Sequence, residues 1–342
     1  MTADRPILLR TGVALAALVL LVAALGVGAA VGETAIPLDV VAKTVANRLW
    51  QAGHAIEPID EGIVWNYRLS RAVVAACCGS ALAICGVILQ SLLRNALADP
   101  YILGISAGAS TGAVAVAILG IGAGILTLPI GAFIGALVAF GLVSALAVRA
   151  GRGTGAIILA GVAGSQLFNA LTSFIVTKAA NAEQARGIMF WLLGNLSGVR
   201  WPDVWLALPV ALLGLVVCLW HARALDAFTF GTESAASLGI PVRRVYVVLI
   251  AVSALMTAVM VSIVGSIGFV GLVIPHAARM VVGVRHGLLL PASALIGAIF
   301  MIAADVLSRI SIPGQVLPIG VITALFGAPA FALILSQRRS AL

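Results

Sequence analysis

Charged residues are scarce in this sequence. Asp, Glu, Lys and Arg together make up 9% of the 342 residues, whereas hydrophobic residues make up 62%. A soluble globular domain usually carries about 25% charged residues, so this composition excludes a soluble fold. The mean hydropathy of +1.18 is typical of a protein that crosses a membrane several times. The sequence therefore predicts an all-α polytopic membrane protein that forms a single domain over residues 1–342.

The motifs of several function classes are also missing. There is no G-x-x-x-x-G-K-[ST] loop, so this chain does not bind ATP by a P-loop. Carriers driven by a proton or sodium gradient normally hold ionisable residues at mid-membrane. Here the only acidic residue near the interior of a predicted span is Asp305, which lies at the outer edge. This weakens the interpretation of the chain as a secondary transporter, which stays open as an alternative.

Histidine and cysteine give no sign of a metal site or an active site. The histidines are dispersed without metal-ligand spacing, and no nucleophile and base can be paired, so we predict no catalytic residue, metal or cofactor. The cysteines all lie inside apolar runs and are interpreted as small membrane-core residues. These residues are His54, His221, His276 and His286, and Cys77, Cys78, Cys85 and Cys218.

Long uncharged runs are what the sequence does contain. A membrane span needs about 20 apolar residues. The run 101–148 is too long for one crossing and divides at Gly and Pro residues in 120–129, and the run 245–278 divides near Gly265. The run 187–199 is too short to cross and is predicted to be a short external helix. The uncharged runs are 11–32, 72–93, 101–148, 153–177, 187–199, 204–219, 245–278, 287–304 and 310–337.

These runs predict ten transmembrane helices with both termini on the same side. If the termini are cytoplasmic, the inner segments hold 12 of the 20 Lys and Arg residues and the outer segments hold 8, as the positive-inside rule favours. The net charge of +8 is spread one or two residues at a time between apolar runs, so we predict contact with membrane lipid and no nucleic-acid partner. The long polar loop 33–67 is then external, with a helix predicted around residues 40–50.

The segment 265–279, which reads G-S-I-G-F-V-G-L-V-I-P-H-A-A-R, is unlike a generic membrane helix. Gly265, Gly268 and Gly271 are three residues apart, and Pro275 removes a backbone donor. On spacing alone the segment is either a packing seam or a broken helix whose end faces a cavity. The run closely resembles a signature of the FecCD/BtuC-like permeases. These are the membrane subunits of type II ATP-binding-cassette importers for iron-siderophores, haem and vitamin B12.

Two further segments carry the same resemblance. Residues 94–104, R-N-A-L-A-D-P-Y-I-L-G, resemble a family motif in which proline usually stands at the position of Ala96. Because Pro100 disfavours helical geometry in the residue before it, we expect the preceding helix to end near Asp99. Arg68 and Arg71 share a helix face, and Arg309 matches a further arginine of the family. The resemblance implies that these arginines dock the binding protein; the alternative for the first two is that they reach toward lipid headgroups.

Polar residues inside the predicted spans indicate a translocation path. Gln166, Asn169, Thr172 and Ser173 fall on one side of their helix, and Gln90 is a buried amide in another. From the residues alone they are either interhelical packing devices or a wet pathway. In the family the corresponding helix lines the path at the axis of a homodimer, so the resemblance favours the pathway.

The inner loop 223–244 resembles the family segment that couples the permease to its ATPase. Gly231 is followed by a predicted short helix at 234–238, which Gly239 and Pro241 end. A short helix here could also lie on the lipid surface. The coupling residues that the resemblance implies are Phe230, Gly231, Thr232, Glu233, Ser234, Ala235, Ala236, Leu238 and Gly239.

Taken together, the resemblance implies a BtuC-like fold in the bacterial inner membrane. The chain would form a homodimer with two cytoplasmic ATPase subunits, which use the ATP, and a periplasmic binding protein. The expected cargo is an iron complex, either haem or a ferric siderophore, and cobalamin is the alternative within the same family.

Overall fold

The computed structural model describes residues 5–32, 34–122, 124–151 and 154–339. Within these ranges every regular element is a helix, and the only extended pairing is a single bridge between Ile312 and Gln315. The predicted all-α class is therefore confirmed.

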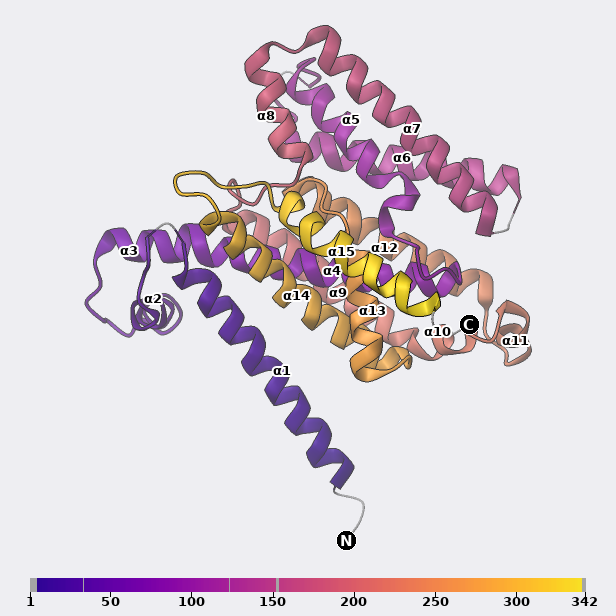
Figure 1. Cartoon of the computed structure of the whole chain (residues 1–342), viewed down its shortest axis with the longest axis horizontal. Helices are drawn as coiled ribbons and strands as arrows, with labels where there is room; N and C mark the ends of the chain where they lie inside the picture. The colour runs from indigo at the N-terminus through magenta and orange to yellow at the C-terminus, as the bar shows by residue number, and fades with distance from the viewer. Residues whose placement is uncertain (1–4, 33, 123, 152–153, 340–342) are drawn as a thin grey trace.

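The helices follow one another with short connections (Figure 1). In chain order they are α1 (Arg5–Ala30), α2 (Leu38–Trp50), α3 (Pro58–Gly62), the π-helix η1 (Ile63–Leu69), α4 (Ser70–Leu92), the 3-10 helix η2 (Pro100–Leu103), α5 (Ile105–Ala117), α6 (Leu128–Ala150), α7 (Thr154–Ala179), α8 (Ala182–Leu192), α9 (Trp201–Trp220), α10 (Ala222–Phe228), α11 (Thr232–Ser237), α12 (Val242–Val264), α13 (Val270–Val282), α14 (His286–Ile310) and α15 (Ile319–Arg339).

The helices divide by length into two sets. Six stretches of the described chain are long and apolar enough to cross a membrane: Pro58–Leu92, Leu128–Ala150, Thr154–Ala179, Trp201–Trp220, Val242–Val264 and His286–Ile310. Four shorter apolar helices lie at Leu15–Ala30, Ile105–Ala117, Val270–Val282 and Ile319–Leu333. The ten stretches correspond one to one with the ten predicted crossings, and six of them are clearly long and apolar enough to span. The chain is a multi-pass membrane protein, and the count of ten and the side of the termini stay predictions.

The bundle is built around α4. In the stretch Pro58–Leu92, which contains α4, 89% of the most apolar part is buried. The buried share of the most apolar part is only 28% in α7 and 28% in α9. A helix that is apolar on all sides is stable only when other helices surround it, and α9, α12, α13 and α14 pack against it. Figure 1 shows α5 to α8 as a second group beside this core, with α12 between them. It also shows α2 and α3 at one end of the bundle and α10 and α11 at the other.

The segment after α4 differs from the expectation. The prediction that this helix ends near Asp99 is wrong, because α4 ends at Leu92. Arg94 adopts a left-handed conformation with φ of 47°, which stops the helix before the proline can act. Asp99 instead accepts a hydrogen bond from the Tyr101 backbone and caps η2.

The predicted external helix is present but shifted. It is α8, Ala182–Leu192, rather than 187–199. Its start is fixed by a capping box, in which the side chains of Asn181 and Gln184 each accept the other's backbone N–H. The uncharged run does not include this start, because Glu183 and Arg186 lie inside the helix.

The other predicted breaks and the loop helix are confirmed. α5 and α6 are separated between residues 117 and 128, and α2 occupies the predicted helix of the external loop. α12 and α13 are separated by the non-helical residues 265–269. Gly265 has φ of 76°, and a Cβ there would lie 2.1 Å from the Trp191 carbonyl oxygen, so only glycine fits. The signature is therefore both a broken helix and a close packing site.

Candidate functional site

The polar residues of α7 divide between two environments. Gln166, Asn169 and Ser173 are exposed on the outer face of the helix. Thr172 is 7% exposed, and its hydroxyl lies 2.8 Å from that of Thr111 on α5. The predicted single stripe is thus three exposed side chains and one packing contact.

The exposed face of α7 is also strongly apolar. Leu159 is 71% exposed and Phe174 is 66% exposed, on the same helix as the three polar side chains. A face of this kind needs lipid, a cavity or a second chain against it. The structure therefore leaves α7 available to line a path between two copies.

Gln90 lies elsewhere. It is 4% exposed on α4, and its side-chain nitrogen donates to the Gly271 carbonyl oxygen of α13 at 3.0 Å. This is the interhelical bond, one of the two alternatives for Gln90 in the sequence. The structure does not bring Gln90 together with the α7 residues, and in the single chain it lines no open surface.

The three arginines assigned to docking are buried at the end of the bundle that carries α2 and α3. Arg68, Arg71 and Arg309 are 7%, 9% and 7% exposed. Arg71 Nε lies 2.6 Å from Asp305 Oδ1, and Arg309 Nη2 lies 3.1 Å from Asp305 Oδ2. Asp305 itself is fully buried. The single carboxylate is thus shared by two guanidinium groups, one from α4 and one from α14.

Two of these arginines also cap α1. Arg68 donates to the Ala30 carbonyl at 2.7 Å, and Arg309 donates to the carbonyls of Gly28 and Val31 at 2.9 and 2.6 Å. The last carbonyls of a helix have no partner within it and carry partial negative charge, so cations there are favourable. The donors that the docking prediction assigned to another protein are used within this chain. The docking role stays a prediction. Only the small exposed parts of these side chains are accessible to a docking protein.

The predicted coupling segment forms the tip at the opposite end of the bundle. α10 packs into the bundle through Leu225 and Phe228, which are 0% and 2% exposed. α11 follows, one turn and a half from Thr232 to Ser237, and the predicted short helix is confirmed with a slightly earlier start. The segment turns at Gly231, with φ of 105°, and at Gly239, with φ of 78°.

Two large apolar side chains project from this tip. Phe230 is 80% exposed and Leu238 is 72% exposed, whereas Ala235 is fully buried. Large exposed apolar residues on both sides of a short polar helix are typical of a surface that another molecule covers. The remaining predicted coupling residues, Thr232, Glu233, Ser234 and Ala236, are exposed around them.

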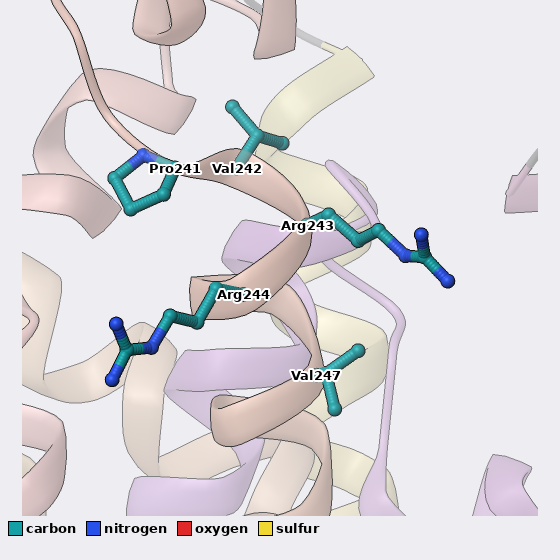
Figure 2. Close-up of a pocket in the computed structure, with 5 residues that line it drawn as sticks. All are labelled: Pro241, Val242, Arg243, Arg244 and Val247. Carbon is teal, nitrogen blue, oxygen red and sulfur yellow. The ribbon is translucent and has the colours of Figure 1, made fainter.

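The surface beside this tip is basic and hollowed. An open depression of about 530 Å³ lies along the first turn of α12, and Figure 2 shows Arg243 and Arg244 extending to opposite sides of the helix. A second hollow of about 570 Å³ lies between α9, α10 and α12. It is lined by Trp220, His221, Arg223, Ala224, Gly239, Ile240, Pro241, Arg244, Val245 and Val248. Positive charge therefore gathers next to the predicted coupling segment.

Sequence reasoning missed a polar cluster near this tip. His286, at the start of α14, is hydrogen-bonded to Asp226 of α10 and to Ser91 of α4. The sequence separates the three residues widely, so their proximity could not be read from spacing. A usable signal was the polar character of His286 beside a long apolar run.

Metal and thiol chemistry find no support in the described part of the chain. No group of three or more His, Cys, Asp or Glu residues there could hold a metal ion. The four cysteines are free and buried.

Comparison with known proteins decides the family. Residues 16–337 match the model of the FecCD transport family. The chain belongs to the FecCD transport family. The resemblance noted from the signature is thereby confirmed over nearly the whole length.

Members of the FecCD family with assigned names share much of this sequence. The chain is 42% identical to the cobalamin import system permease protein BtuC of Halobacterium salinarum, over 94% of this chain and 95% of that protein. It is 37% identical to the Fe(3+) dicitrate transport system permease protein FecD of Escherichia coli, over 85% of this chain and 89% of that protein. A solved structure described as an inward-facing ATP-binding-cassette transporter of metal-chelate type is 28% identical. It matches with a TM-score of 0.82 over 96% of this chain and 99% of that chain.

Proposed function

We propose that this chain is the permease subunit of an ATP-binding-cassette importer that carries a bulky metal chelate into the cytoplasm. The match of residues 16–337 to the FecCD transport family carries the proposal. Both named relatives are permease proteins of transport systems for metal chelates, cobalamin in one case and ferric dicitrate in the other.

The chain would cross the bacterial inner membrane ten times, with both termini in the cytoplasm. The helices α1, α5, α13 and α15 complete the count, and the two short ones among them, α5 and α13, cross a membrane when loops buried in protein extend them. The segment 265–269, which is enclosed by α8 and α15 residues, supplies such an extension to α13. The tip formed by α10 and α11 then faces the cytoplasm, and α2 and α3 face outward.

Two copies would form the path. The exposed α7 face, with Gln166, Asn169 and Ser173 among apolar side chains, supports an axis at which two chains meet. Separate ATPase subunits would bind the tip through Phe230 and Leu238, whose exposure supports this contact. A binding protein would deliver the cargo at the outer end, where Arg68, Arg71 and Arg309 lie.

The cargo class has two candidates. The sequence predicted an iron complex, haem or a ferric siderophore, and the FecD similarity supports a ferric chelate. The 42% identity to a cobalamin import permease favours cobalamin somewhat more. Both cargos are bulky metal chelates, so the same permease architecture serves either.

The test is uptake by the chain reconstituted in vesicles with its own ATPase and binding protein. We expect uptake only when ATP is present on the ATPase side and hydrolysable. Cobalamin, haem and a ferric siderophore, offered separately, identify the cargo by the one that accumulates. Uptake that follows a proton or sodium gradient without ATP would instead support the secondary transporter.

A further inference from the structure

A chain of short hydrogen bonds joins three helices next to the coupling segment. His286 Nδ1 lies 2.7 Å from Asp226 Oδ1, and His286 Nε2 lies 2.6 Å from the Ser91 hydroxyl. The His286 side chain is 3% exposed. The three residues belong to α14, α10 and α4, so one buried imidazole connects all three helices.

The direction of these bonds follows from chemistry. An ionised carboxylate only accepts hydrogen bonds, so Asp226 Oδ1 accepts from His286 Nδ1. The same oxygen accepts from the His286 backbone N–H at 2.8 Å. In the neutral imidazole Nε2 is then the acceptor, and the Ser91 hydroxyl donates to it. Both ring nitrogens are therefore used, and turning the ring would break both bonds.

Asp226 also caps α14 from outside. His286 is the first residue of that helix, and its backbone N–H has no acceptor within the helix. A carboxylate at a helix N-terminus is favourable because it meets the positive end of the helix dipole. Moving α10 away would leave the backbone N–H and the buried Nδ1–H of His286 unpaired, which makes separate movement of α10 and α14 costly.

α10 leads directly into the coupling segment. Only three residues separate Phe228, the last residue of α10, from Thr232, the first of α11. Gly231 between them lies beside the end of α4, because a Cβ there would be 3.6 Å from Arg94 Nη1. The coupling segment is thus joined through α10 to both α14 and α4.

α4 and α14 are also joined along their length. At mid-bundle a Cβ on Gly79 would lie 2.0 Å from the Gly297 carbonyl oxygen, and Ser80 donates to the Ala294 carbonyl at 2.8 Å. At the far end Arg71 binds Asp305 at 2.6 Å. The helix rise of 1.5 Å per residue puts Ser91 and Arg71 about 30 Å apart. The two helices are tied at both ends and in the middle.

We propose that His286 is a positioning residue that attaches the coupling segment to the α4–α14 pair, so that the pair passes movement between the ATPase side and the outer end. The inference rests on the proposed function. It adds a specific connection between the coupling segment and the α4–α14 pair, and this connection requires Ser91, His286 and Asp226 together.

The decisive variants change Ser91, because the hydroxyl can be removed or kept with little change in volume. Ser91→Ala removes the donor to His286, and Ser91→Thr keeps a hydroxyl. Ser80→Ala is the matched control, because Ser80 also bridges α4 and α14 through its hydroxyl but touches neither His286 nor α10. His286→Ala removes the whole connection. The measurement is the amount of cargo imported per ATP hydrolysed in reconstituted vesicles, with assembly checked by size exclusion.

We expect His286→Ala to lower the cargo imported per ATP about tenfold, the usual size of a coupling between two sites. Ser91→Ala should lower it about 2- to 10-fold, the effect of one hydrogen bond. Ser91→Thr should restore the wild-type ratio, and Ser80→Ala should leave the ratio unchanged. A purely structural bond would reduce the amount of assembled protein but not the cargo imported per ATP.

The outcomes separate this inference from the proposed function. A wild-type assembly that imports nothing with ATP would overturn both. If the wild type imports cargo and Ser91→Ala imports the same amount of cargo per ATP, only the positioning role is overturned. The same holds if Ser91→Ala and Ser80→Ala lower the cargo imported per ATP equally. If His286→Ala fails to assemble, the comparison of Ser91→Ala with Ser91→Thr still decides.

Discussion

Asp305 shows how a single carboxylate organises the outer end of the bundle. It is fully buried between Arg71 and Arg309, and with Arg68 nearby the cluster holds three positive side chains and one negative. Buried charges are stable only when they are paired and hydrogen-bonded. The carbonyls at the end of α1 supply the remaining acceptors, so α1, α4 and α14 are fastened at one point.

Replacing Asp305 with Asn should destabilise the protein strongly. The change leaves two buried guanidinium groups without a counter-charge, and breaking a buried ion pair costs about 3–5 kcal/mol. The measurement is the thermal unfolding midpoint of the purified chain in detergent. Asp39→Asn is the control, because Asp39 pairs with Lys43 at 2.9 Å on the exposed surface of α2. We expect little change there, because exposed pairs contribute little. Equal midpoints for Asp305→Asn and wild type would contradict the structural role.

The end of the short helix α11 depends on the backbone conformation of one residue, Gly239. Its φ is 78°, and a Cβ would meet nothing within 4 Å, so a substitution is strained by conformation and not by space. Gly239→Val should cost about 1–2 kcal/mol locally and disorder the end of α11. Gly239→Asn should be tolerated, because Asn adopts the left-handed region more readily.

The readout for Gly239 is the ATPase rate of the assembled complex with and without binding protein. We expect Gly239→Val to lose the stimulation by binding protein, and Gly239→Asn to keep it. Membrane insertion should be normal for both, because the residue lies outside the spanning helices. Stimulation of Gly239→Val equal to wild type would show that α11 is only a surface helix.

The long elements were predictable and the short ones less so. Apolar runs located all ten apolar helices, and the cluster of Gly and Pro at 120–129 located the break between α5 and α6. The start of α8 and the end of α4 were misplaced because they depend on a capping box at Asn181 and on the left-handed Arg94. Such local side-chain and backbone choices leave no trace in hydropathy.

Individual site residues were harder to predict than helices. Polarity identified Gln90, Gln166, Asn169 and Ser173, but it could not say that Gln90 is enclosed while the other three are exposed. Burial depends on which helices become neighbours, and a sequence pattern does not contain that information. Asp226, Ser91 and His286 were missed for the same reason, since each comes from a different helix.

At the scale of the whole molecule, the exposed apolar face of α7, which carries Leu159 and Phe174, is a surface that a second copy of the chain can cover. If two copies meet there, residue 173 of one copy lies close to residue 173 of the other, since equivalent residues approach each other at a two-fold axis. Ser173→Cys should therefore give a cross-linked species of two chains when membranes are treated with an oxidant. Leu213→Cys on α9, where Leu213 is 65% exposed, should stay a single chain. Cross-linking of Leu213→Cys without cross-linking of Ser173→Cys would place the interface at α9 instead of α7.

The burial of the four cysteines has a practical consequence. Cys77 is 5% exposed, Cys78, Cys85 and Cys218 are 0% exposed, and none forms a disulfide. Thiol-reactive spin labels and fluorophores need an accessible sulfur, so the natural thiols should stay unlabelled in the folded protein. A pair of introduced cysteines at Val284 and Tyr67, which are 66% and 52% exposed, can then carry the only probes. Pulsed electron spin resonance between them would follow the length of the bundle through the ATP cycle without any native cysteine being removed.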